Sequence, residues 1–443
     1  MWKVVLALTC GLSNYLFDMP APRNALHTLL VCVLMKPFAP ANRIPYLHAR
    51  RDLKMAKSAH AYVRGNTARF YEWLADTRVS RIIPQGPAVW ICGDCHLGNL
   101  GPLADSDGKV EIQIRDLDQA VIGNPAHDLI RLGLSLATAA RGSDLPGVIT
   151  ARMIEEVMTG YLKAFFDPQQ IKDEAQPEPD AVRTVRRRAV ARKWRHLAKE
   201  RLEDVEPVIP LGKRFWPLSE NEHVALRDAI IHPPVSNMIL SLDHLGAERS
   251  PLMVDAAYWM KGCSSLGLLR FAVLVALKGK KNTDYALIDL KEAVGPVAPA
   301  APGVQMPDDP AERVQAAARA LSPNLGDRMA TANILGHSLF ARELMPQDLK
   351  IEIDQFSEGQ ALKASRYLAF VIGKAHARQM NKVTRKDWIA TLQSGRSREL
   401  DAPSWLWQAI VAMAARHEAG YLDHCRIYAL SQEEKPATAL LRC

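Results

Sequence analysis

Hydrophobic and polar residues in the first half of the chain recur with periods that switch between helical and extended. Aromatic residues at helical spacing predict a helix within 61–77, and the apolar run 87–92, which ends in a polar turn, predicts a short buried strand. A second strand is expected at 110–115, followed by helices at 126–141 and 151–166. This half is therefore expected to be mainly helical, with short strands that end in polar turns.

The second half opens with extended segments and then returns to helices. Between 256 and 291, apolar stretches separated by turns predict consecutive antiparallel strands, the first two joined by a glycine-bounded loop. A proline- and alanine-rich segment, 294–310, separates these strands from a helix that starts near Ala311. Residues 337–354 suggest a strand, a connector and another strand, and 360–380 predicts a long helix with one apolar face.

Together these elements predict an α+β protein of two lobes, a small antiparallel sheet lobe and a larger, mainly helical lobe. The helical lobe is expected to take residues 51–250 and 351–443, and the sheet lobe with its connector to take 251–350. Residues 1–50 contain five prolines and show little periodicity, so they are expected to form a leader or a loosely packed arm. The sequence shows no internal repeat at a fixed period.

Composition and charge narrow the class of ligand. With 443 residues and 48% hydrophobic content, the chain can bury a large core. A net charge of +8 favours anionic partners such as nucleotides, nucleic acid or acidic lipid. Nine basic residues between Arg183 and Arg201 alternate with apolar ones. This segment is interpreted as a helix with a solvated basic face, or alternatively as a site for phosphate or nucleic acid.

Cysteine usage and apolar stretches bear on the compartment. The seven cysteines are dispersed in a chain too long to need a disulfide scaffold, so reduced thiols are expected. Residues 1–12 resemble a short export signal, but no small-residue cleavage site follows cleanly. No apolar stretch reaches the roughly 20 residues of a membrane-spanning helix. The sequence therefore predicts a cytoplasmic protein without a membrane partner, with export as a minor alternative, and it leaves the oligomeric state open.

Four polar side chains follow the two short strands of the first half. The strand 87–92 leads to Asp94 and Asn99, and the next strand leads to Asp116 and Asp118. Carboxylate and amide oxygens suit Mg²⁺, which keeps several waters and binds phosphate oxygens beside one or two carboxylates. An Asp next to such a metal can orient a hydroxyl group for phosphoryl transfer, in which positioning and charge neutralisation supply most of the rate.

Three segments carry a resemblance to known enzymes. GDCHLGN at 93–99, RDLD at 115–118 and GNPAHDL at 123–129 resemble the catalytic segment of the aminoglycoside and choline kinase branch of the kinase-like superfamily. The chain departs from protein kinases at Leu117 and Asp118, which replace the Phe-Gly that follows the metal-binding Asp there. Small-molecule kinases tolerate this change, so a small hydroxyl compound is the favoured acceptor.

The resemblance assigns a role to each carboxylate of these segments. Asp94 is implied to be the catalytic base or orienting carboxylate, and Asn99 and Asp116 to be metal ligands. Asp118 is a candidate additional ligand, and Asp128 is implied to brace the catalytic turn. ATP and Mg²⁺ are the implied cofactors, and the partners are this nucleotide and an unidentified hydroxyl acceptor.

The nucleotide-binding parts of this superfamily appear later in the chain than usual. GCSSLG at 262–267 resembles a phosphate-covering loop, although it has two glycines where protein kinases usually have three. Lys291 resembles the phosphate-pairing lysine, Glu312 its partner, and FARELMP at 340–346 the connector that cradles adenine. The expected nucleotide-binding residues are Gly262, Ser264, Ser265, Gly267, Lys291, Glu312 and Glu343.

The order of these parts implies a circularly permuted kinase-like fold, in which the helix 360–380 would normally run into the catalytic turn. Such a permutation is admissible because domain termini often lie close together. Over residues 50–390, the order YVRG, GDCHLGN, LIDLKEA and AHARQ resembles the bacterial family called domain of unknown function 2252. Arg64 of YVRG is a further candidate site residue.

Three alternatives remain open at this stage. The same residues can belong to a nucleotide-binding pseudokinase, or to an enzyme that transfers AMP rather than phosphate. Cys92, Cys95 and His96 also fit the C-x-x-C-H pattern of haem attachment, typical of a c-type cytochrome. For His96 itself, a structural hydrogen bond to the turn is favoured over a metal role.

Overall fold

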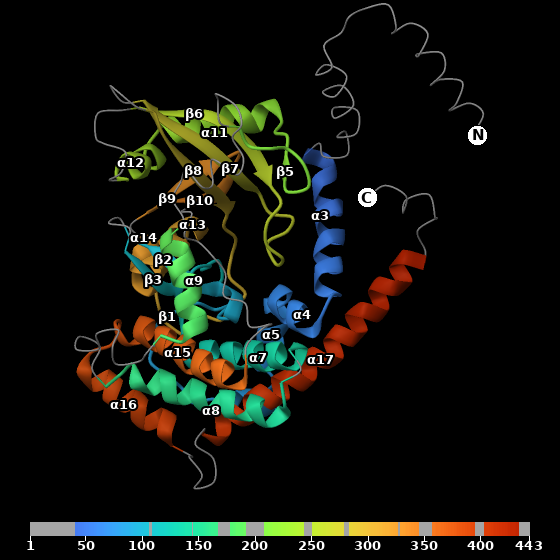
Figure 1. The fold of residues 1–443 in the computed structure, drawn as a ribbon, viewed down its shortest axis with the longest axis vertical. Helices are drawn as coiled ribbons and strands as arrows, with labels where there is room; N and C mark the ends of the chain where they lie inside the picture. Colours follow the sequence, from blue (N-terminus) through green and yellow to red (C-terminus); the bar gives the residue numbers. More distant parts are fainter. Residues whose placement is uncertain are drawn as a thin grey trace, which may run out of the picture.

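Figure 1 shows a lobe built on a sheet above a lobe built mostly of helices, each assembled from segments far apart in the sequence. The computed structural model describes residues 40–105, 109–143, 145–166, 178–191, 208–242, 250–278, 283–326, 328–344, 357–394 and 403–433. The protein is α+β, as expected.

The upper lobe contains a six-stranded antiparallel sheet in the order β5-β6-β7-β8-β10-β9. Its strands are β5 (Phe215–Trp216), β6 (Pro251–Trp259), β7 (Arg270–Lys278), β8 (Thr283–Glu292), β9 (Met329–Ile334) and β10 (His337–Glu343). Helices α11 (Glu220–Ile231) and α12 (Val235–Leu240) share a hydrophobic core with the sheet. The predicted hairpin across 256–277 and the third strand that follows it are therefore confirmed.

Two short antiparallel ribbons lie below this sheet. One pairs β1 (Val89–Ile91) with β4 (Val121–Gly123), and the other pairs β2 (Leu100–Ala104) with β3 (Val110–Ile114). The chain passes from the first ribbon to the second through the 3-10 helix η2 (Leu97–Asn99), and it returns through 115–120. Both connections therefore run side by side, and the Arg115 N–H donates to the Asn99 carbonyl at 2.7 Å.

The lower lobe is mainly helical and surrounds a second hydrophobic core. Its helices are α4 (Ala59–Gly65), α5 (Thr67–Leu74), α6 (Thr77–Ser80), α7 (Ala126–Gly142), α8 (Gly147–Lys163), α15 (Glu358–Ala377), α16 (Lys382–Gln393) and α17 (Ser404–Glu433). Helices α13 (Pro310–Leu321) and α14 (Pro323–Gly326) lie between this core and the sheet (Figure 1). The expected helix within 61–77 is broken at Asn66, whose side chain accepts from the Arg69 N–H and so starts α5.

Local caps explain where two helices important for the site begin. Asp309 accepts hydrogen bonds from the backbone N–H groups of Ala311 and Glu312, and Pro310 occupies the first turn of α13. At α15, Ser357 and Gln360 form a reciprocal capping box. The helices predicted from Ala311 and within 360–380 therefore begin close to where the sequence places them.

Two expected boundaries differ from the structure. Residues from Pro40 onward were expected in a loose arm that ends at 50, but α3 (Pro40–Met55) is a helix. Pro40 is tolerated at its first position, and buried Arg43 forms an ion pair with Glu222 near the sheet. In addition, β5, α11 and α12 belong with the sheet, although they lie within the range 51–250 assigned to the helical lobe.

The basic segment is described only in its first half. Helix α9 (Asp180–Ala191) contains Arg183, which pairs with Asp180, and Arg186, which pairs with Glu178. Residues 192–201 of the segment lie outside the described residues, as do the signal-like start and the second strand expected within 345–354. Binding of nucleic acid to the basic helix therefore stays a prediction.

Within the described segments, no helix is long and apolar enough to cross a membrane. The cysteines that these segments contain, Cys92, Cys95, Cys263 and Cys425, are free thiols. This agrees with the expected reduced state for those four residues.

Candidate functional site

The turn that follows β1 is held in place by Asp128 of α7. Its carboxylate accepts hydrogen bonds from the N–H groups of Cys92 (2.8 Å) and Gly93 (3.0 Å). Gly93 has a φ of 71°, and a Cβ atom there would lie 2.1 Å from the backbone oxygen of Gln119. Only glycine therefore fits, and the turn presents Asp94 in one direction.

The carboxylate of Asp128 belongs to a buried network. It lies 3.2 Å from His376 Nε2 on α15, and His376 Nδ1 lies 2.9 Å from the Tyr161 hydroxyl. That hydroxyl also accepts from the indole of Trp388 at 3.2 Å. The network connects α7, α8, α15 and α16 to the turn, which matches the bracing role that the resemblance implies for Asp128.

Asp94 is buried and pairs with Arg131 of α7. Arg131 approaches the Oδ1 atom of Asp94 with Nε at 2.9 Å and Nη2 at 2.8 Å. Burial raises the pKa of Asp94, whereas the positive charge and hydrogen bond of Arg131 lower it. The side-chain amide of Asn99 donates to the Asp94 backbone oxygen at 2.9 Å, so the turn closes on itself.

The C-x-x-C-H motif has a structural arrangement. Cys92 and Cys95 are fully buried in the lower core. His96 is also buried, and its Nδ1 atom accepts from the Gly98 N–H at 3.0 Å, so His96 caps the turn as expected. Burial lowers the pKa of His96 well below its usual range. This arrangement gives no support to haem attachment.

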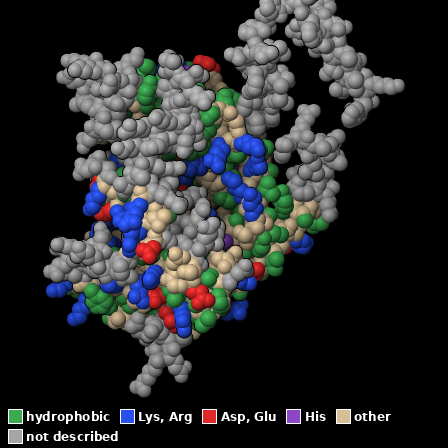
Figure 2. All heavy atoms as spheres, viewed as in Figure 1, with side chains coloured by type: hydrophobic (Ala, Val, Ile, Leu, Met, Phe, Trp, Pro, Cys, Tyr) green, Lys and Arg blue, Asp and Glu red, His purple; other side chains and the backbone are tan. Residues whose placement is uncertain are grey.

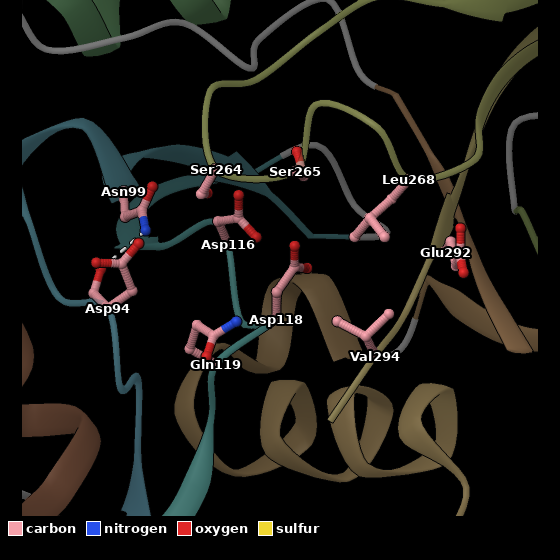
Figure 3. Close-up of a pocket in the computed structure, with 10 residues that line it drawn as sticks. All are labelled: Asp94, Asn99, Asp116, Asp118, Gln119, Ser264, Ser265, Leu268, Glu292 and Val294. Carbon is pink, nitrogen blue, oxygen red and sulfur yellow. Dashed lines mark hydrogen bonds between the residues drawn. The ribbon is translucent and has the colours of Figure 1, made fainter. Parts of the chain in front are cut away.

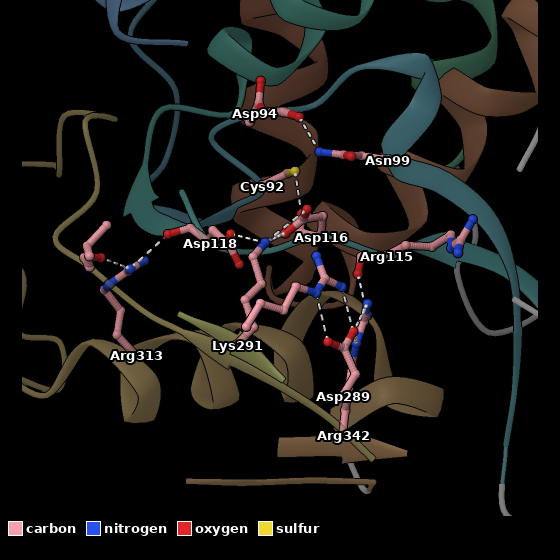
Figure 4. A network of polar contacts seen from close by, with 12 residues as sticks. Cys92, Asp94, Asn99, Arg115, Asp116, Asp118, Asp289, Lys291, Arg313 and Arg342 are labelled. Carbon is pink, nitrogen blue, oxygen red and sulfur yellow. Dashed lines mark hydrogen bonds and ion pairs between the residues drawn. The ribbon is translucent and has the colours of Figure 1, made fainter. Parts of the chain in front are cut away.

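Lys291 of β8 meets Asp116 and Asp118 across the gap between the lobes (Figure 4). Its Nζ atom lies 3.2 and 3.3 Å from the two oxygens of Asp116 and forms a closer ion pair with Asp118. The Lys291 side chain is 4% exposed, whereas that of Asp116 is 44% exposed. The segments 94–116 and 262–291 therefore face each other, as the sequence predicts.

A small pocket, with a volume of about 80 Å³, lies between the loop at 262–267 and the carboxylates. Figure 3 shows Ser264 and Ser265 on one side of it. The opposite side and the rim are formed by Asp94, Asn99, Asp116, Asp118, Gln119, Leu268, Glu292 and Val294. Gly262 and Gly267 bound the loop with φ of 100° and 113°, a conformation that favours glycine. The loop therefore faces the expected metal residues.

Two expected site residues lie apart from this group. The ion pairs of Lys291 are with the two aspartates, and the side chain of Glu312 is exposed in the first turn of α13. Glu343 is buried at the end of β10, where it pairs with Arg328. The structure thus brings neither glutamate to the pocket, and part of the expected connector, 345–346, lies outside the described residues.

Two arginines at the site were missed from the sequence. Arg131 pairs with Asp94, and Arg313 of α13 donates to the backbone oxygens of Asp118 (2.8 Å), Val294 (3.0 Å) and Ala120. The sequence offered a signal for Arg131, because it follows Asp128 by three positions in a predicted helix, and residues at this spacing lie on the same helix face. Arg313 had none, because its partners are backbone atoms of distant segments.

Beyond Lys291, the face of the sheet that looks onto the site is charged (Figure 4). Asp289 is fully buried and receives Arg270 at 2.6 and 2.8 Å and Arg342 at 3.1 and 3.2 Å. Arg342 also donates to the Arg115 carbonyl at 2.9 Å. These charges lie beside Lys291, so a ligand that extends from the pocket along β8 would meet an ion-pair network rather than an apolar wall.

The side chains at 94–118 include oxygen atoms that could hold a metal ion. The Oδ1 atom of Asp118 is buried without a hydrogen-bond donor, and Asp116 beside it is partly exposed. Among the described residues there is no group of three or more His, Cys, Asp or Glu arranged to hold a metal. Two aspartates with Asn99 nevertheless suit Mg²⁺, which retains waters and takes few protein ligands.

Mg²⁺ binding is expected to depend on pH through Asp118. Burial and the neighbouring Asp116 raise the pKa of Asp118 from 3.8 to about 7. A carboxyl group with a raised folded-state pKa holds a proton longer in the folded state, so without metal the contribution of Asp118 to stability is lost as pH rises from about 4 to about 7. Because the metal requires the ionised form, its affinity should increase about tenfold per pH unit up to pH 7 and then level off.

Mg²⁺ titration followed by calorimetry between pH 5.5 and 8.5 measures this dependence. In Asp118→Asn the affinity is expected to be weaker and independent of pH. The same slope in the variant would assign the proton to another group.

Comparison with protein families finds one relationship. A family model described as an uncharacterized protein conserved in bacteria matches residues 43–427. No curated protein and no solved structure matches the chain.

Proposed function

From the site of this chain, which belongs to the bacterial family DUF2252, we propose that the protein is an ATP- and Mg²⁺-dependent phosphotransferase that acts on a hydroxyl group. The family expected from the sequence over 50–390 is confirmed, and its match is wider. The proposed acceptor is a small molecule.

The pairing of Lys291 with Asp116 carries this proposal. It connects β8, the second strand after the loop 262–267, to a carboxylate that follows the Asp94 turn, although the two residues are 175 positions apart. Phosphoryl transfer needs a cation for the phosphates, carboxylates for the metal and an orienting carboxylate for the hydroxyl around one cleft. The pocket between Ser264 and the carboxylates is where the proposal brings these groups together.

A second contact supports a circularly permuted kinase-like fold. Gln379, just after α15, accepts from the Trp90 N–H at 2.8 Å and donates to the Trp90 carbonyl at 3.0 Å. Trp90 belongs to β1, the strand that leads to Asp94. The end of α15 thus lies against the start of the catalytic turn, as it would if the two were consecutive in an unpermuted chain.

In the proposed mechanism, Asp94 orients the acceptor hydroxyl and receives its proton. Arg131 holds Asp94 in one position, while Asn99 and Asp116 would hold the metal, with Asp118 as an additional ligand. When bound, the metal would supply charge neutralisation for the phosphates, and Lys291 adds a positive charge on the side of the sheet. The loop at 262–267 covers the phosphates and keeps water from competing with the acceptor.

The charged network around Asp289 sets a condition on the nucleotide base. A nucleotide whose base reached the sheet beside Lys291 would meet Arg270, Asp289 and Arg342 there. The proposal therefore has the base contact charged side chains, through hydrogen bonds or stacking on a guanidinium group.

Replacing Asp94 with asparagine tests the catalytic assignment. Transfer of phosphate from ATP to a pool of small hydroxyl compounds, followed by mass spectrometry, is expected to slow about 10²- to 10⁴-fold in Asp94→Asn. The matched control is Asp228→Asn, because Asp228 is exposed on α11, away from the pocket. Mg-ATP should still stabilise both variants against heat.

The same products separate the alternatives. An increase in acceptor mass by AMP would replace phosphoryl transfer with nucleotidyl transfer. Stabilisation by Mg-ATP without any transfer would indicate a pseudokinase. Equal rates for Asp94→Asn and wild type would remove Asp94 from the mechanism.

A further inference from the structure

Arg64 approaches the catalytic turn from the side of α4. Its guanidinium group lies flat against Gly98, because a Cβ atom built there would be 2.8 Å from Nη2 and 2.9 Å from Cζ. Gly98 belongs to η2, between His96 and Asn99. The absence of a side chain at 98 is therefore what lets Arg64 reach this turn.

The Arg64 side chain forms no hydrogen bond or ion pair with any described residue, and its Nε atom is buried. Two buried arginines near the cleft have carboxylate partners: Arg131 pairs with Asp94 and Arg270 with Asp289. Arg64 is partly exposed, and its buried Nε–H has no acceptor, a cost in free energy that a bound oxyanion would recover. Arg64 is therefore a candidate ligand-binding residue.

The charges around Arg64 place it on the acceptor side of the cleft. Besides the effect of burial, the Arg64 charge lowers the pKa of His96 and of Cys263 in the loop at 262–267. The cations that lower the pKa of Asp116 are instead Lys291, Arg342 and Arg270. Because Arg64 packs on Gly98 and His96 Nε2 lies 3.7 Å from Asp94 Oδ2, Arg64 stands beside the turn that carries Asp94 and Asn99.

Neighbouring basic side chains lie beside the same loop. Lys54 of α3 donates to the Gly262 carbonyl at 2.7 Å, and His48 lies against Gly267, where a Cβ atom would be 2.8 Å from Nε2. Figure 2 shows Lys and Arg side chains gathered beside the hollow between the lobes, where α3 passes. The path from this side to Asp94 is therefore positively charged.

We propose that Arg64 binds an oxyanion of the acceptor, so that the acceptor is a hydroxyl compound that also carries a phosphate or carboxylate group. The proposal rests on the proposed function, because it assigns the acceptor to the side of Asp94. A guanidinium group suits both anions, since its parallel N–H groups can donate to two oxygens at once.

The test measures binding of inorganic phosphate and, separately, acetate to the full-length protein by calorimetry, with and without Mg²⁺ and a non-hydrolysable ATP analogue. Wild type is compared with Arg64→Gln and with Arg69→Gln, whose exposed arginine pairs with Glu72. Gly98→Ala is the second variant, because its methyl group displaces the guanidinium without removing it.

We expect phosphate or acetate to bind wild type and Arg69→Gln equally with the analogue present, and at least tenfold more weakly to Arg64→Gln and Gly98→Ala. The stronger of the two anions identifies the acceptor group. Affinity for the analogue should be the same in all four proteins.

Three outcomes would overturn the proposal. The first is that neither anion binds wild type, and the second is that the anions bind Arg64→Gln as tightly as wild type. The third is that anion and analogue compete and the analogue binds Arg64→Gln more weakly than wild type, which would assign Arg64 to the nucleotide. Failure of the proposed function has a different signature, because the analogue would then not bind wild type at all, whatever the anions do.

Discussion

Replacing Asp116 with alanine is expected to abolish the stabilisation of the protein by Mg-ATP. At a ligand concentration of about 100 times Kd, wild type should gain about 2.7 kcal/mol from binding, and the variant should gain almost none. The fold itself should survive, because the Asp116 side chain is partly exposed and Lys291 keeps its ion pair with Asp118. The loss would therefore report on the site and not on the scaffold.

Thermal unfolding with ATP alone, Mg²⁺ alone and both together is the measurement. Asp228→Ala on α11 serves as the control, since its exposed carboxylate lies away from the cleft. Equal shifts in Asp116→Ala and wild type would show that Asp116 does not bind the metal.

Replacing Asp128 with alanine is expected to lower the free energy of unfolding by about 3–5 kcal/mol. Asp128 is fully buried, and its removal leaves the N–H groups of Cys92 and Gly93 without acceptors and His376 without its carboxylate. Buried donors that lose their partner cost more than the lost bond itself. Because these N–H groups begin the Asp94 turn, nucleotide-dependent activity should fall as well.

Urea unfolding followed by circular dichroism measures this loss. The matched control is Asp423→Ala, which removes one member of an exposed i,i+3 pair with Arg426 and should cost at most about 1 kcal/mol. A loss for Asp128→Ala no larger than that of the control would contradict a bracing role. Asp128→Asn should be intermediate, since its amide offers one acceptor oxygen instead of two.

The sequence predicted most of the elements that surround the site. The hairpin β6–β7, the strand that ends near Lys291 and the helices α7, α13 and α15 all follow from local periodicity and turn residues. The carboxylates after the short strands were found for the same reason, because a strand end followed by a glycine-rich turn is a local feature. The family match over 43–427 covers both the motifs at 93–129 and the later ones at 262–291.

Other features depended on which distant groups meet. Lys291 was expected to pair with Glu312, but the ion pairs it forms are with Asp116 and Asp118. The basic residues of a chain with 56 Lys and Arg cannot be matched to 48 acidic ones from spacing alone, because ion pairs form between side chains from any part of the chain. Helix α3 shows the same limit. Its prolines led to the prediction of a loose arm, whereas an ion pair between Arg43 and Glu222 holds the helix near the sheet.

Hydrophobic spacing and turn chemistry act between neighbours in the chain, and this is why the α+β class and the strand-end positions of Asp94, Asn99 and Asp116 could be predicted without coordinates, whereas the role of the loop at 262–267 came from resemblance. The pairing of Arg131 with Asp94, the charged network at Asp289 and the unpaired guanidinium of Arg64 arise where separate segments are brought together. Their energies depend on distance and burial, which exist only after the two lobes have packed.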